Sequence, residues 1–184
     1  IWMPTLHARN QIEYFGRDPF ANHPGIRLLD ENGDLKPEVL EILDLIKEYD
    51  ATIATGHISI GESIAVCNAA RERGVRTVLT HPDWTCTTVP ADVQTQLVKK
   101  GDILEKLWFD IGINHVTAEY MAQTIRDAGV ENCFMATDRG QSGKEYPVEG
   151  LMMFMDAMLD CGFSVEEIHI MTHENPERVL GLRP

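Results

Sequence analysis

Three short apolar segments of the chain each end in a side chain that can bind a metal ion or move a proton. The segments and their last residues are 51–57 with His57, 76–81 with His81, and 133–138 with Asp138. Short runs of apolar and β-branched residues are typical of buried parallel strands. Because the carboxyl ends of parallel strands converge on one face, we expect the two imidazoles and the carboxylate to lie together.

Two neutral imidazoles and a carboxylate suit Zn²⁺, Mn²⁺ or Fe²⁺, and residue types alone do not choose among them. Zn²⁺ is the ion that we expect. Such an ion lowers the pKa of bound water toward 7, and Asp138 would then act as the general base. Arg9 and Arg139 could orient an anionic substrate, since guanidinium groups match carboxylates and phosphates. His7, at the end of an earlier apolar run, is a candidate for contact with substrate or metal.

Each candidate also has a purely structural interpretation. A histidine at a strand end is commonly a hydrogen-bonded residue at the border of a loop. Asp110 is predicted to point near the site, but a buried hydrogen bond that orients its neighbours is the favoured interpretation. His115 is placed to begin a helix, and His173 lies in the C-terminal helical region, where a structural role is expected.

The sequence predicts five strands that alternate with helices, which is typical of an α/β protein with a parallel sheet. The predicted strands are residues 1–6, 51–57, 76–81, 106–111 and 133–138. Helices are predicted from Pro37, where apolar residues recur at helical spacing, and over 62–73, 90–100 and 115–128, each followed by glycine.

Three further segments complete the prediction. Residues 10–34 show no helical period and are predicted as a long loop, with a β-hairpin around the Asn-Gly pair at 32–33. Residues 147–159 hold four of the eight methionines, which we interpret as core packing. Ser164 and Glu167 have the spacing of a capping box at the start of the last helix.

Composition narrows the class of protein. The 184 residues suffice for one domain with a real core, and the net charge of −13 argues against nucleic-acid and anionic-membrane partners. The four cysteines form no C-x-x-C pair, so no disulfide framework is expected. With neither a signal peptide nor an apolar run of membrane-spanning length, a cytoplasmic protein with a small-molecule substrate is the expectation.

These residues resemble the amidohydrolase superfamily of metal-dependent hydrolases. The resemblance rests on Gly-His at 56–57, Thr-His-Pro at 80–82, the strand-end Asp138, and the tail Glu-Asn-Pro-Glu-Arg-Val-Leu-Gly-Leu at 174–182. It implies a (β/α)8 TIM barrel of which the chain supplies strands 4 to 8. It also implies that His57, His81 and Asp138 ligate a divalent metal, with hydrolysis of a C–N or C–O bond as the reaction.

The chain departs from that family pattern in two ways. It has no His-x-His pair of the kind found on the family's first strand, and no lysine at the end of residues 1–6, so a mononuclear site is expected. We expect either further sequence ahead of Ile1 or pairing with another copy in a homo-oligomer. A decarboxylase on the same scaffold, and a non-catalytic incomplete barrel with a binding role, remain alternatives.

Overall fold

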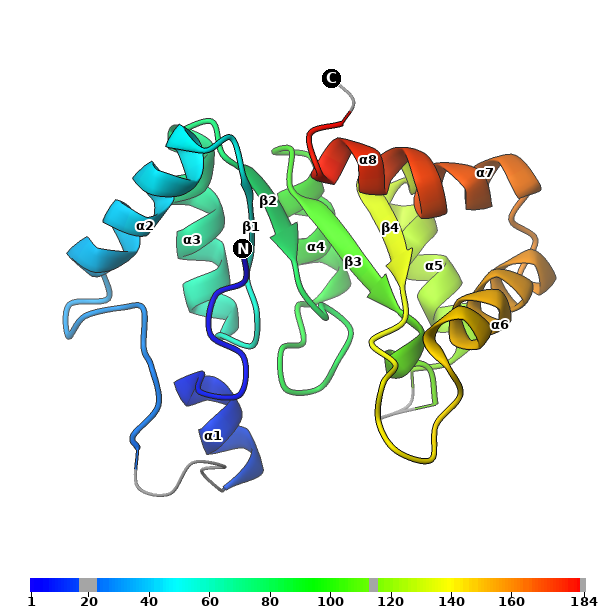
Figure 1. Ribbon diagram of the computed structural model, residues 1–184, viewed down its shortest axis with the longest axis horizontal. Coiled ribbons are helices and arrows are strands. Elements are labelled where there is room, and N and C mark those ends of the chain that lie inside the picture. The colour runs from blue at the N-terminus through cyan, green and yellow to red at the C-terminus, as the bar shows by residue number, and fades with distance from the viewer. Residues whose placement is uncertain (17–22, 113–115, 183–184) are drawn as a thin grey trace.

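A four-stranded parallel sheet runs through the middle of the molecule (Figure 1). The structure is a computed structural model that describes residues 1–16, 23–112 and 116–182. The strands are β1 (Thr52–Ala54), β2 (Arg76–Leu79), β3 (Ile103–Leu107) and β4 (Cys133–Ala136). Each strand pairs in parallel with the next along the chain, so the spatial order is β1-β2-β3-β4.

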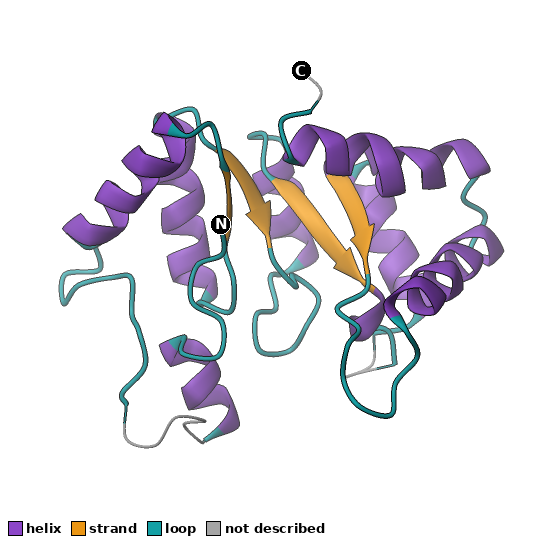
Figure 2. Cartoon of the chain, in the orientation of Figure 1, coloured by secondary structure: helices purple, strands orange, loops and turns teal. Residues whose placement is uncertain are grey.

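Helices connect the strands and cover one face of the sheet (Figures 1 and 2). The α-helices are α1 (Arg9–Phe15), α2 (Pro37–Glu48), α3 (Ile60–Glu72), α4 (Ala91–Val98), α5 (Ala118–Ala128), α6 (Pro147–Asp160), α7 (Val165–His169) and α8 (Asn175–Val179). Short 3-10 helices span Trp108–Asp110 and Val130–Asn132, and a π-helical turn spans Ile170–Glu174. None of the helices in the described residues has the length and hydropathy needed to cross a membrane.

The side chains of the strands alternate between two apolar environments. On the helix-covered face, Leu79 and Leu104 join the main core with residues of α3, α4, α5 and α6. On the opposite face, the register places Ala54, Val78 and Ile103 side by side, where Val179 of α8 packs against them. The sheet therefore has one thickly covered face and one face on which only part is covered by α8.

The first of the five predicted strands does not form. Within residues 1–6, Trp2 makes a single parallel bridge to Ala54, and the Met3 N–H donates to the Ala54 carbonyl at 2.9 Å. Beyond Met3, the Pro4 carbonyl accepts from the His57 N–H at 2.9 Å, where β1 has already ended and Gly56 turns the chain. The described chain thus has four strands, with the N-terminal segment lying alongside β1.

The predicted strand at 106–111 is displaced toward the C-terminus. The strand observed is β3, and the Trp-Phe-Asp sequence that follows forms a 3-10 helix. The prediction began at Lys106 and so missed 103–105, because the adjacent charges of Glu105 and Lys106 interrupt the apolar run. Both residues are nevertheless buried, and Lys106 is fully so.

Most of the predicted helices are confirmed. The capping box at Ser164 is present, with the Ser164 side chain accepting from the Glu167 N–H. The predicted hairpin is reduced to one antiparallel bridge between Leu29 and Leu35. Helix α1 lies in what was predicted as loop.

The interpretation of the methionines of α6 as core was only partly right. Met158 is fully buried, whereas Met152 and Met153 lie on the exposed side of the helix. Helical periodicity explains the difference, because a helix with apolar residues on most of its circumference can bury only one side.

Replacing Gly56 with alanine should destabilise the fold by at least about 1 kcal/mol. Gly56 turns the chain after β1 with φ +63°, and a Cβ there would lie 2.4 Å from the Met3 carbonyl oxygen. Gly33→Ala is the matched control, because Gly33 has φ +88° with nothing within 4 Å of the added methyl group. Urea unfolding should show a larger loss of unfolding free energy for Gly56→Ala than for Gly33→Ala. Equal losses would mean that the N-terminal segment moves to make room for the methyl group.

Candidate functional site

The three residues that were predicted to meet do line one cavity. Its volume is about 380 Å³, and it opens where the strands end. His57 and His81 follow β1 and β2, and Asp138 follows β4. The rest of the lining is Trp2, Thr5, Leu6, Thr80, Glu105, Leu107 and Ala136.

His81 lies between two carboxylates. Its Nδ1 is 3.3 Å from Asp110 Oδ1, and its Nε2 is 3.5 Å from Asp138 Oδ2. Burial works to lower the pKa of His81, but the hydrogen bond and charge of Asp110, together with the charges of Glu105 and Asp138, outweigh it and raise the pKa. Asp110 is itself buried, and burial raises its pKa. Asp110 therefore fixes the orientation of the His81 ring, as one of the two sequence interpretations supposed.

His57 is the second imidazole of the cavity. Its Nδ1 contacts Gln11 Oε1 from α1, so Nε2 is the ring nitrogen left for a metal ion or a substrate. Burial lowers the pKa of His57 to about 4, and the neighbouring charge of His81 adds to the effect. At neutral pH the ring is therefore uncharged, the state in which imidazole binds a metal.

The backbone at two of these positions is unusual. His81 has φ +50° and Asp138 has φ +47°, in the left-handed region that residues other than glycine rarely adopt. Such conformations cost about 1–3 kcal/mol and cluster at functional sites, where the surrounding structure enforces them. Here the left-handed turn occurs directly after β2 and β4, where it directs the chain over the cavity.

The two imidazoles are the residues of the cavity whose type and spacing a shared divalent metal would require. Two imidazoles that share a Zn²⁺ ion at about 2.0–2.1 Å have ring centroids about 5 Å apart. The rings of His57 and His81 are 5.3 Å apart, and both Nδ1 atoms have the oxygen partners typical behind metal-bound histidines. Among the described residues, however, no three His, Cys, Asp or Glu side chains form a ready metal-binding group.

Glu105 was missed as a site residue. It is buried at the cavity between β2 and β4, and burial raises the pKa of its carboxyl to about 7. A glutamate inside an otherwise apolar strand was the available signal. It was overlooked because the strand itself had been placed too late in the sequence.

Aromatic rings surround the two histidines. The Trp84 ring lies 5.1 Å from the His57 ring and 5.3 Å from the His81 ring, and Phe109 lies 6.3 Å from Trp84. The contacts of Trp84 with both imidazoles show that it packs beside the site.

The residues predicted to bind substrate lie elsewhere. Arg139 is 2.5 Å from Glu145 and packs over the Phe109 ring, with its centroid 5.7 Å away. Arg9 is 2.6 Å from Glu13 and lines a small separate cavity. The structure therefore unites the three predicted metal ligands but gives both guanidinium groups an acidic partner.

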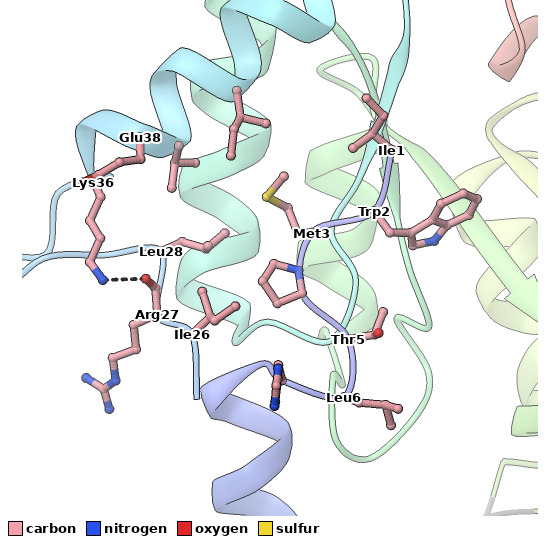
Figure 3. A pocket seen from close by; sticks show the side chains of 14 residues that line it. Ile1, Trp2, Met3, Thr5, Leu6, Ile26, Arg27, Leu28, Lys36 and Glu38 are labelled. Carbon is pink, nitrogen blue, oxygen red and sulfur yellow. Dashed lines mark hydrogen bonds between the residues drawn. The ribbon is translucent and has the colours of Figure 1, made fainter. Parts of the chain in front are cut away.

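His7 lines a different cavity, of about 750 Å³, between the N-terminal segment and α2 (Figure 3). Its ring stacks on His23 at 5.1 Å. The apolar side chains of this cavity include Met3 and Leu28. His115, predicted to begin a helix, lies outside the described residues.

Comparison with protein families places part of the chain in a family. Residues 1–105 match the profile of a family described as a family of unknown function, DUF6282. The matched part includes α1 to β2, the two cavity histidines and Glu105. A comparison with curated proteins found no matching sequence. Because the match covers more than half of its residues, the chain belongs to the DUF6282 family.

Proposed function

We propose that this chain carries a metal-dependent hydrolytic site of the amidohydrolase type. The expected substrate is a small molecule with a scissile C–N or C–O bond, and the expected compartment is the cytoplasm. The observation that carries the proposal is the convergence of His57, His81 and Asp138 from three strand ends into one cavity. Strand-end side chains in a parallel sheet are where enzymes of this architecture place their chemistry.

The same proposal includes a barrel. The strands follow one another in sequence order without the reversal that marks a doubly wound sheet, and the N-terminal segment continues that order beside β1. The partly covered face bears the small and medium-sized side chains of Ala54, Val78 and Ala136. An arc of consecutive parallel strands with helices outside is what part of a (β/α)8 barrel would look like.

Each residue of the cavity then has a role. His57 and His81 would hold a divalent cation, with Zn²⁺ preferred and Mn²⁺ or Fe²⁺ as alternatives, and Asp138 would join them. When bound, such an ion supplies Lewis acidity toward a carbonyl oxygen and toward water. Asp138, which is 46% exposed, accepts the proton of the attacking water and passes it to the leaving group. Asp110 holds His81 in place.

The sequence candidates for substrate binding need a different interpretation under this proposal. A guanidinium held by Glu145 and packed on Phe109 stabilises the loop after Asp138, so Arg139 shapes the wall of the site. Arg9, in its own cavity, would position α1 and through it Gln11, whereas His7 lines a separate cavity.

A non-catalytic binding role is the second candidate. It is favoured by the finding that the described residues hold no ready group of three metal ligands. A decarboxylase would use the same donors, so products must separate it from a hydrolase. Lactones, amides and aryl carboxylates would be screened together, with carbon dioxide release as the mark of decarboxylation.

Metal content tests the proposal directly. We expect chelator-free protein loaded with Zn²⁺ to retain an ion that the His57→Ala/His81→Asn variant loses, as measured by plasma mass spectrometry after dialysis. Asparagine is chosen at position 81 because it tolerates the left-handed backbone better than alanine does. The control is His7→Ala/His23→Ala, which removes two stacked imidazoles from elsewhere. Equal metal retention in all three proteins would overturn the proposal.

A further inference from the structure

A second pair of imidazoles lies on the surface, away from the cavity. His169 is the last residue of α7, and His173 lies in the π-helical turn Ile170–Glu174 that joins α7 to α8. Helices α7 and α8 lie at the end of the sheet where the strands begin (Figure 1). His57 and His81 follow the opposite, carboxyl ends of the strands. The two pairs are therefore independent features of the fold.

The local sequence explains why the two rings share a face. Residues four apart lie on the same side of a helix, and a π-helical turn changes this little. The turn ends where Pro176 has no N–H to offer. Asn175 anchors it, because the Asn175 side-chain amide donates to the Val130 and Cys133 carbonyls at 2.7 and 2.6 Å.

The geometry of the pair suits one shared ion. The ring centroids of His169 and His173 are 4.9 Å apart, close to the separation of about 5 Å expected for two imidazoles on one Zn²⁺ ion. Their side chains are 51% and 54% exposed, so an ion can reach them from solvent.

Two carboxylates lie beside the rings. Glu174 Oε1 is 3.8 Å from His169 Nε2, and Glu177 Oε1 is 3.5 Å from His173 Nε2. Negative charge next to the two imidazoles favours a cation, since it attracts the ion and can orient its water ligands. The chain's net charge of −13 acts in the same direction.

We propose that His169 and His173 chelate a late first-row divalent cation at this surface, with Glu174 and Glu177 as neighbouring carboxylates. No three ligating side chains form a ready group in the described part of the chain, so water completes the coordination and the ion exchanges readily. Affinity should follow Cu²⁺ over Ni²⁺ and Zn²⁺, as for other nitrogen donors. Mg²⁺ and Ca²⁺, which prefer oxygen ligands, should not compete.

Calorimetric titration of the metal-free protein with Cu²⁺, Ni²⁺ and Zn²⁺ tests the proposal. To isolate the pair, the titration is run in the His57→Ala/His81→Asn background as well as in the unmodified chain. His169→Gln and His173→Gln should each weaken binding at this site at least tenfold, and the double variant should abolish it. Glutamine keeps the helix, and both positions are half-exposed, so circular dichroism should be unchanged.

A matched control decides whether any two histidine rings at this separation would bind the ion. His7 and His23 have rings 5.1 Å apart, so His7→Ala/His23→Ala removes a comparable ring pair away from α7 and α8. We expect this variant to keep the Cu²⁺ affinity of the unmodified chain. Unchanged affinity in His169→Gln/His173→Gln, or an equal loss in the control, would overturn the proposal. Neither result bears on the cavity, whose ligands are titrated separately.

Discussion

Replacing Lys106 with methionine should lower the free energy of unfolding by about 3–5 kcal/mol. The Lys106 side chain is completely buried, and its Nζ donates to Asp83 Oδ2 at 2.7 Å, Gln94 Oε1 at 2.9 Å and Thr124 Oγ1 at 3.0 Å. Methionine fills a similar volume, but it leaves the Asp83 carboxylate buried without its counter-charge. Urea denaturation followed by circular dichroism measures the loss.

A double-mutant cycle separates the ion pair from packing. Because the Asp83 carboxylate is the group left stranded, Lys106→Met/Asp83→Leu should be less destabilised than the sum of the two single variants. Lys100→Met is the control, since Lys100 is exposed, and its effect should stay within about 0.5 kcal/mol. A loss below about 1 kcal/mol in Lys106→Met, with no coupling to Asp83, would mean that water reaches the site.

Strand β3, which contains Lys106, shows what the hydrophobic pattern of a sequence does not reveal about the fold. The strands containing Ile53, Val78 and Met135 are apolar on both faces, so their runs are visible in the sequence. In β3 the buried residues include Glu105 and Lys106, whose burial depends on partners from α4, α5 and the cavity. Partners that distant in sequence cannot be inferred from one segment. The strand was therefore predicted too far toward the C-terminus, at 106–111.

Helix α1 shows a second limit. Its seven residues, from Arg9 to Phe15, are too few to be helical by propensity alone, and they include only one buried side chain, Gln11. The contact of Gln11 with His57 and the donation by Asn10 to the His57 and Cys86 carbonyls tie the helix to the cavity. Its stability therefore comes from tertiary contacts that no local pattern displays.

The candidate site was predictable where it depends on topology. A polar residue directly after a buried parallel strand must reach the common edge of the sheet, and this rule brought His57, His81 and Asp138 together. The strand-end rule does not predict where the guanidinium groups of Arg9 and Arg139 lie, because nearby carboxylates hold them. The Arg9–Glu13 spacing of four is a recognisable helical ion pair, whereas Arg139 and Glu145 meet through a loop.

Asp138→Asn should reduce hydrolysis by roughly 10²–10⁴-fold if Asp138 is the general base of the proposed site. Asparagine has nearly the same shape and tolerates the left-handed backbone, with φ +47°, so the fold should be kept. The amide cannot accept a proton at neutral pH, and it is a poorer ligand for Zn²⁺ than a carboxylate is. Turnover is measured on the best substrate from the lactone and amide screen, beside Zn²⁺ affinity by calorimetry.

Two comparisons make this result interpretable. Asp138→Ala should lose as much turnover and also some stability, because alanine fits the left-handed conformation less well than asparagine does. His169→Gln/His173→Gln should retain full turnover, since that pair lies at the opposite edge of the sheet. If Asp138→Asn keeps normal turnover while Zn²⁺ affinity falls, Asp138 is a ligand without a proton-transfer role. Glu105, buried in the same cavity with its pKa raised to about 7, would then be the next general base to test.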